Sequence, residues 1–230
     1  MEVGFGDWDL LGIVGRGLVI GFVLAAPVGP IGMLCIVRTL RFGRIAGLAT
    51  GLGAATADAT YAALVAFGLA TLTATLVSVQ TPLAIGGGIV LAAIGIRTIR
   101  APVVPAPAND RAGTAAHQEP EAPSSRSLYL GTVALTLANP ATILTFVGIL
   151  AGITSGMTRS PFATALLVMA VFCGSALWWL VLTGAMGLVR RRWLAGDATG
   201  IDGRRMRLLN AISGVVLIAF GVLALVHAVM

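Results

Sequence analysis

The sequence contains no lysine, and charged residues make up only 10% of it. An ordinary soluble domain carries about 25% charged residues, so this chain lacks the polar surface that a protein in water needs. Cysteine is also scarce: Cys35 and Cys173 both fall in apolar stretches, with no spacing typical of a metal site or a disulfide framework. Hydrophobic residues account for 57%, and the mean hydropathy is +0.97. The composition therefore predicts an integral membrane protein, and we expect it to hold no metal and no cofactor.

Six apolar segments are long enough to cross about 30 Å of hydrocarbon as helices, which takes roughly 18 residues or more. They cover residues 14–37, 45–69, 79–98, 129–154, 161–188 and 208–229. The strands of a lipid-facing barrel would instead alternate apolar and polar residues over about ten positions. The residues before the first segment are acidic and lack the basic start of a signal peptide, so we expect that segment to be retained. The predicted fold class is an all-α integral membrane protein with six transmembrane helices.

Thirteen of the fifteen arginines lie in the loops that follow the first, third and fifth apolar segments or at the adjoining ends of those segments. Cytoplasmic loops of membrane proteins carry an excess of basic residues, so these three loops are predicted to be cytoplasmic and both termini to lie outside. The basic charge then reflects topology and contact with membrane lipids, not nucleic acid. We expect a multi-pass membrane protein.

A stretch rich in Pro, Ala and Ser, residues 101–127, separates two halves with three apolar segments each. Its composition is typical of a flexible linker, here on the cytoplasmic side. The sequence GIVLAAIGI at 88–96 resembles GVVLIAFGV at 214–222, near the ends of the two halves. Because three is an odd number, the second half inserts upside down relative to the first. We interpret residues 1–100 and 128–230 as two inverted three-helix repeats, which are typical of transporters; convergence between glycine-rich helices is the alternative.

Proline and glycine interrupt the first apolar segment at Pro27, Gly29 and Pro30. A proline inside a helix removes a backbone hydrogen bond, so the helix is predicted to break or bend there. The dipeptide Asn139-Pro140 occupies the matching place in the second half. Unpaired backbone groups are tolerated in a membrane only where they face protein or a water-filled cavity. Paired breaks thus predict a central cavity in which helix amino termini bind a carboxylate; a packing kink without a ligand is the alternative.

Asp58 is the only acid inside an apolar segment, where an acid costs about 2.5–3.5 kcal/mol on insertion scales. Gly43, Gly47 and Gly51 recur every four residues before it, which favours close packing of another helix beside the acid. An acid in the protein interior can exchange a proton or bind an ammonium group. Tyr61, three residues on, shares its side of the helix. A purely structural acid, hydrogen-bonded to a neighbouring helix, is the alternative.

The fifth apolar segment contains a run of small residues, Cys173-Gly174-Ser175-Ala176, followed by Trp178 and Trp179. Small residues allow another helix to approach closely, so Ser175 is a candidate site residue. The two tryptophans are candidates for a wall of the same site, with Trp178 as the preferred residue. They are equally well explained as bulky packing residues.

Several stretches resemble the LysE-type family of amino-acid exporters. They are APVGPIGMLCIVRTLRFGRIAGLATGLGAATADATYAALVAFGLA, LANPATILTFVGI, GSALWWLVL and NAISGVVLIAFG. The resemblance implies a six-helix inner-membrane carrier that moves amino acids or related small solutes out of the cytoplasm, driven by the proton-motive force. It also implies that Asp58 matches the membrane acid of the family. Two motifs differ: Val28 replaces the first proline of the family's Pro-Gly-Pro, and Ala141 replaces the lysine of its Asn-Pro-Lys.

Together these features predict a secondary transporter, not an enzyme, that exports amino acids or related small zwitterionic solutes by proton-coupled alternating access. The breaks at Gly29 and Asn139 are expected to hold the substrate carboxylate, and Asp58 the amino group or the coupling proton. The alternatives are a metal or other cation exporter of the same architecture, a membrane-embedded enzyme and a non-transporting membrane assembly protein. The glycine-rich surfaces also permit a homodimer.

Overall fold

The computed structural model describes residues 7–27, 29–67, 78–101, 123–139, 142, 145–146, 160–194 and 203–229. Within these residues every regular element is helical. The helices are α1 (Asp7–Ala25), α2 (Pro30–Phe42), α3 (Arg44–Ala66), α5 (Gln80–Arg100), α6 (Ser125–Leu137), α8 (Pro161–Val189), the π-helical turn η1 (Arg190–Leu194) and α9 (Gly203–Val229). The all-α prediction is confirmed for this part of the chain. Most of the predicted linker and Pro140 lie outside the described residues.

Helices long and apolar enough to cross a membrane are found in both halves of the described chain. α5, α8 and α9 each contain such a stretch, and α1 with α2 passes the same test as one bent span. α3 is 23 residues long but is rich in Gly, Ala and Thr and carries Asp58. It packs against α2, α6 and α8, so most of its surface faces protein, where small residues are favoured over large apolar ones. Six separate spans are therefore still a prediction.

The first predicted span is broken, as the prolines and glycine of its sequence indicate. α1 ends at Ala25, α2 begins at Pro30, and the two helices meet at an angle of 79°. Pro30 is well suited to the first turn because it has no backbone N–H to leave unpaired there. Gly29 precedes it as the N-cap and has no side chain to cap the helix. The amino terminus of α2 is thereby left without a side-chain cap.

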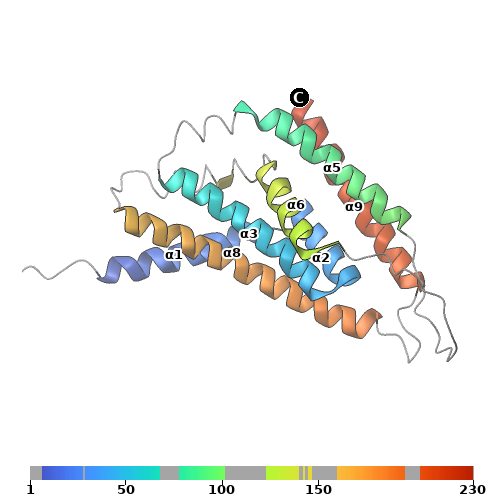
Figure 1. Cartoon of the computed structure of the whole chain (residues 1–230), viewed down its shortest axis with the longest axis horizontal. Coiled ribbons are helices and arrows are strands. Elements are labelled where there is room, and N and C mark those ends of the chain that lie inside the picture. The colour runs from blue at the N-terminus through green and yellow to red at the C-terminus, as the bar shows by residue number, and fades with distance from the viewer. Residues whose placement is uncertain are drawn as a thin grey trace, which may run out of the picture.

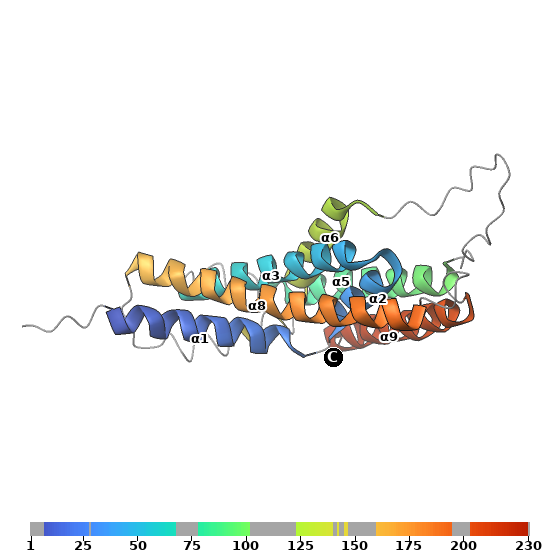
Figure 2. The same cartoon turned by 90° about the horizontal axis from the view of Figure 1, so that it is seen from below.

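The helices pack as two groups that meet around α2 (Figures 1 and 2). α1 lies along α8, α3 lies between α8 and α6, and α5 pairs with α9. Glycines bring the backbones together where α1 and α8 meet. A methyl group added at Gly21 would overlap the carbonyl of Val171, and one added at Gly174 would overlap the carbonyl of Leu18. This close approach is typical of helices packed inside a membrane.

The pairing of α5 with α9 rests on four glycines in two crosswise contacts. A methyl group added at Gly95 would lie 2.6 Å from the carbonyl oxygen of Gly214, and one added at Gly214 would lie 2.6 Å from that of Gly95. Gly88 and Gly221 show the same reciprocal relation, at 2.8 and 2.7 Å. These glycines belong to the similar sequences at 88–96 and 214–222. The first glycine of each sequence contacts the last glycine of the other. The two helices are therefore antiparallel.

α3 reverses the direction of α2 through a tight turn at Gly43, whose φ of +92° is a conformation that other residues rarely adopt. The next two glycines of the four-residue repeat, Gly47 and Gly51, contact Thr183 and Trp179 of α8. The predicted close packing of a second helix along these glycines is confirmed. It holds the middle of α3, and with it Asp58, against α8.

Candidate functional site

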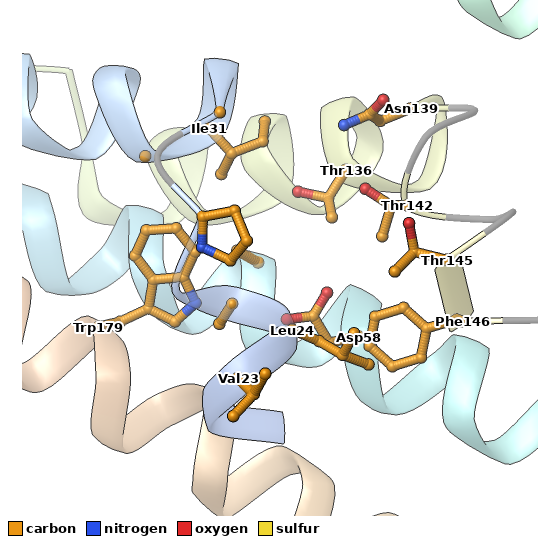
Figure 3. Close-up of a pocket in the computed structure, with 15 residues that line it drawn as sticks. Val23, Leu24, Ile31, Asp58, Thr136, Asn139, Thr142, Thr145, Phe146 and Trp179 are labelled. Carbon is orange, nitrogen blue, oxygen red and sulfur yellow. The ribbon is translucent and has the colours of Figure 1, made fainter. Parts of the chain in front are cut away.

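A cavity of about 350 Å³ lies at the break between α1 and α2 (Figure 3). Four helices surround it: α1 and α2 at the break, α3 and α8, with the end of α6 and the residues after it closing the remaining side. The lining residues are Val23, Leu24, Ala25, Pro27, Gly29, Ile31, Gly32, Ala54, Asp58, Thr136, Asn139, Thr142, Thr145, Phe146 and Trp179. Cavities of 300 to about 1,000 Å³ are the usual size of small-molecule sites.

Asp58 provides the carboxylate of the cavity. Its side chain is 6% exposed, and its Oδ2 accepts a hydrogen bond of 2.7 Å from the Ser175 hydroxyl of α8. The indole N–H of Trp179 in turn donates to the Ser175 oxygen at 3.2 Å. The predicted pair Asp58 and Ser175 is thus brought into contact, and Trp179 joins them one helical turn further along α8.

The broken helix supplies backbone groups to the same cavity. Pro27 and Gly29 line it, as do Ile31 and Gly32 in the first turn of α2. First-turn amides have no partner within an α-helix, and the amino end of a helix carries a partial positive charge. Pro30 is not among these residues but lines a smaller cavity of about 20 Å³ that shares Ile31 and Asn139 with the first.

Hydroxyl and amide groups form the side of the cavity opposite Trp179 (Figure 3). They come from the end of α6 and the residues that follow: Thr136, Asn139, Thr142 and Thr145. Thr136 is 3% exposed, and its hydroxyl makes no hydrogen bond to any described residue. A buried polar group without a partner is uncommon and calls for an explanation such as a ligand or water.

Tyr61 and Trp178 were candidates from the sequence, but neither lines the cavity. The Tyr61 hydroxyl donates to the Leu137 carbonyl at 2.6 Å, and its ring lies 6.0 Å from that of Phe146, which does line it. Trp178 packs edge-on against Phe22 of α1, with ring centroids 5.4 Å apart. Successive helix residues point about 100° apart, and of the two adjacent tryptophans it is Trp179 that lines the cavity.

The threonines after the α6 terminus and Phe146 are site residues that the sequence reasoning did not identify. A signal for them exists in the stretch TLANPATILTF, where hydroxyl residues flank the second break within an otherwise apolar run. Pro140, the other candidate at that break, lies outside the described residues. Asn139, by contrast, lines both cavities.

The groups around the cavity are complementary to a small solute with two opposite charges. The carboxylate of Asp58 suits an ammonium group, and the first turn of α2 suits an anion. Hydroxyl groups on one side and apolar side chains such as Val23 and Ile31 on the other complete the lining.

The fold and cavity together define an all-helical, multi-pass membrane protein with a solute-sized site beside a broken helix. The chain belongs to the LysE type translocator family, whose model matches residues 22–228. A curated relative from Bacillus subtilis (strain 168), "Putative amino acid efflux protein YcgF", is 28% identical over 207 residues, which cover 89% of this chain and 90% of the relative. No solved structure matches the chain.

Proposed function

We propose that this protein is a secondary transporter that exports amino acids or related small zwitterionic solutes from the cytoplasm. The substrate binds in the cavity at the α1–α2 break, with its ammonium group on Asp58 and its carboxylate at the first turn of α2. Asn139 and the neighbouring threonines bind the remaining polar atoms. Membership of the translocator family and the amino acid efflux named for the Bacillus subtilis relative both support this substrate class.

The observation that carries the proposal is the position of Asp58. It is the only acid within the apolar segments of the sequence, and it opens into the same cavity as the uncapped amino terminus of α2. An ionisable residue inside a membrane segment is expensive to insert and marks a functional site by default. A packing role alone would not require a cavity of about 350 Å³ beside it.

Residues 1–100 and 128–230 form two inverted repeats in this proposal, joined by the linker at 101–127. Some of the helix contacts support it, because they have an equivalent when the halves are exchanged. In the proposed repeats α3 is equivalent to α8, and α5 is equivalent to α9. The helices of each equivalent pair contact each other and are antiparallel. The contact of α1 with α8 has its counterpart in the contact of α6 with α3, and both of these pairs are parallel. Inverted repeats provide two equivalent openings of one central site.

Proton coupling follows from competition at Asp58. A protonated Asp58 cannot bind an ammonium ion by charge attraction, so proton entry from outside releases the substrate and returns the carrier. One elementary charge crossing a potential of 100 mV supplies about 2.3 kcal/mol, enough to drive export against a gradient.

The arginine-rich end of the bundle is the cytoplasmic end in this proposal, with both termini outside the cytoplasm and the chain in the inner (plasma) membrane. Contacts between separate arginine-rich loops support a shared side. Gly43, in the turn after α2, lies beside Arg190, and Arg44 packs on Gly187 of α8. Arg97 and Arg100 end α5, next to the start of α9 in both views (Figures 1 and 2).

Counterflow of a panel of radiolabelled amino acids into proteoliposomes tests the proposed function. We expect at least one to exchange with the wild type, and a pH gradient to drive its net transport. Asp58→Asn keeps the shape of the side chain and should abolish the proton-driven component. Asp197→Asn, which removes an acid outside the apolar segments, is the matched control. Unchanged proton-driven transport in a folded Asp58→Asn protein would show that the acid is structural.

A further inference from the structure

Arg38 is a half-buried cation that the proposed transport cycle does not yet use. Its Nη1 donates three hydrogen bonds, to the Thr50 hydroxyl at 3.0 Å, the Thr132 hydroxyl at 2.9 Å and the Leu128 carbonyl at 3.4 Å. These three acceptors are uncharged and belong to α3 and α6. Buried arginines are usually paired with an acid, and the apolar segments contain none except Asp58.

The other two nitrogens of the guanidinium group are still available. Among the described residues, Nε and Nη2 of Arg38 make no hydrogen bond, and neither belongs to the buried atoms that lack a partner. Neither nitrogen is therefore fully buried. An arginine offers five donors in a rigid planar fork, and two parallel donors on one edge match the two oxygens of a carboxylate. Thr50 and Thr132 hold one side of this fork in place and leave the carboxylate-binding edge open.

Arg38, Thr50 and Thr132 form a cluster that lies close to the cavity along α2, α3 and α6. Thr50 is one helical turn from Ala54, and Thr132 is one turn from Thr136; both of the latter line the cavity. Arg38 itself is six residues beyond Gly32, which is about 9 Å along α2 at 1.5 Å per residue. Along α2, Arg38 thus lies between the cavity and Arg41 in the last turn of the helix.

We infer that Arg38 is a second binding site, an entry site that takes the carboxylate of the substrate before the substrate reaches Asp58. This inference rests on the proposed function. Asp58 is eight residues from Thr50, about 12 Å along α3, so one small amino acid cannot contact Arg38 and Asp58 together. The two sites are used in succession. The carboxylate binds the Nε and Nη2 edge of Arg38 first and passes to the first turn of α2 as the ammonium group reaches Asp58.

The test is side-specific transport by the full-length protein in oriented proteoliposomes, using the amino acid that wild-type counterflow identifies and its α-carboxamide. Arg38→Gln should raise KM at the arginine-rich face about tenfold, the effect of one lost charge-assisted hydrogen bond. KM at the opposite face should stay nearly constant. The wild type should prefer the acid over the amide at the arginine-rich face, and the variant should lose that preference.

Three variants separate binding from folding and from general charge. Arg41→Gln removes a neighbouring charge of the same helix and should leave the preference for the acid intact. Arg38→Lys keeps the charge without the paired donors and should show an intermediate KM. Thr132→Val removes one support of Nη1 and should change thermal stability more than KM. If Arg38→Gln does not fold, Arg38→Lys and the acid-to-amide ratio of the wild type decide the question.

Several outcomes would overturn the inference. An unchanged KM in Arg38→Gln, or an equal change at both faces, would make Arg38 a structural residue. An effect that disappears in vesicles of phosphatidylcholine alone, which has no net charge, would assign the guanidinium to the headgroup of an anionic lipid. If the wild type shows no counterflow, both the proposed function and this inference are wrong. If the wild type is active and Arg38→Gln is unaffected, only this inference is wrong.

Discussion

The carboxylate of Asp58 and the hydroxyl of Ser175 are 117 residues apart in the sequence and are joined by a hydrogen bond of 2.7 Å. The bond joins α3 to α8, which correspond to the second predicted span of each proposed repeat. It orients the carboxylate at the edge of the cavity, since Ser175 is itself held by the indole of Trp179. A single contact between the halves therefore positions the group on which binding is proposed to depend.

Ser175→Ala removes the donor to Asp58. Hydrogen bonds between membrane helices average about 0.6 kcal/mol and reach about 1.7 kcal/mol, so we expect a modest loss in the free energy of unfolding and a clear loss of substrate affinity. Thermal unfolding and counterflow measure the two effects. Ser213→Ala, at a buried serine of α9, is the control and should leave affinity unchanged. Equal affinity in the two variants would argue against a role for the bond in binding.

The two adjacent tryptophans should respond differently to the same substitution. Trp179→Phe removes the donor to Ser175 and part of the cavity wall, so we expect weaker substrate binding. Trp178→Phe changes packing against Phe22 and the neighbouring core and should alter thermal stability without altering affinity. Substrate quenching of tryptophan fluorescence offers a second readout, because Trp179 lines the cavity and Trp178 does not. Quenching that persists in Trp179→Phe and is lost in Trp178→Phe would contradict this assignment.

Thr136→Val should separate stability from binding. The Thr136 hydroxyl is buried without a partner among the described residues, and leaving a polar group unsatisfied costs about 1–3 kcal/mol. Valine has nearly the same shape, so the empty protein should become as stable as the wild type or more so, while substrate affinity falls. Thermal unfolding with and without substrate measures both. Thr183→Val, which removes a satisfied hydroxyl, should instead reduce stability and leave affinity alone.

Alanine at Gly95 or Gly214 should separate α5 from α9. The new methyl groups would each lie 2.6 Å from the carbonyl of the opposite glycine, and overpacking of this kind typically costs about 1–3 kcal/mol. Because the contacts are reciprocal, the two substitutions should destabilise by similar amounts in thermal unfolding. Gly86→Ala, with nothing within 4 Å of the added methyl group, is the control. A large difference between Gly95→Ala and Gly214→Ala would count against equivalent repeats.

The sequence alone was sufficient for the helical fold, the break between Pro27 and Pro30 and the interior position of Asp58. Each depends on local chemistry: composition decides the solvent, proline and glycine interrupt the helix, and an acid in an apolar run must face protein. The similar glycine sequences also indicated two related halves. Six spans and the inverted repeat are still predictions. α3 is too poor in large apolar residues to be recognised as a span by hydropathy, and most of the fourth apolar segment after residue 139 lies outside the described residues.

Only the tertiary structure decided which side chains meet. The sequence favoured Trp178, but the rotation of α8 against α3 turns Trp179 towards Asp58 and Trp178 towards Phe22. The hydroxyl side of the cavity, including Thr136, and the support of Arg38 by Thr50 and Thr132 likewise depend on how α6 lies against α3. Local sequence determines where a helix begins, bends and ends, whereas the faces that pack together are set by contacts between residues far apart in the chain.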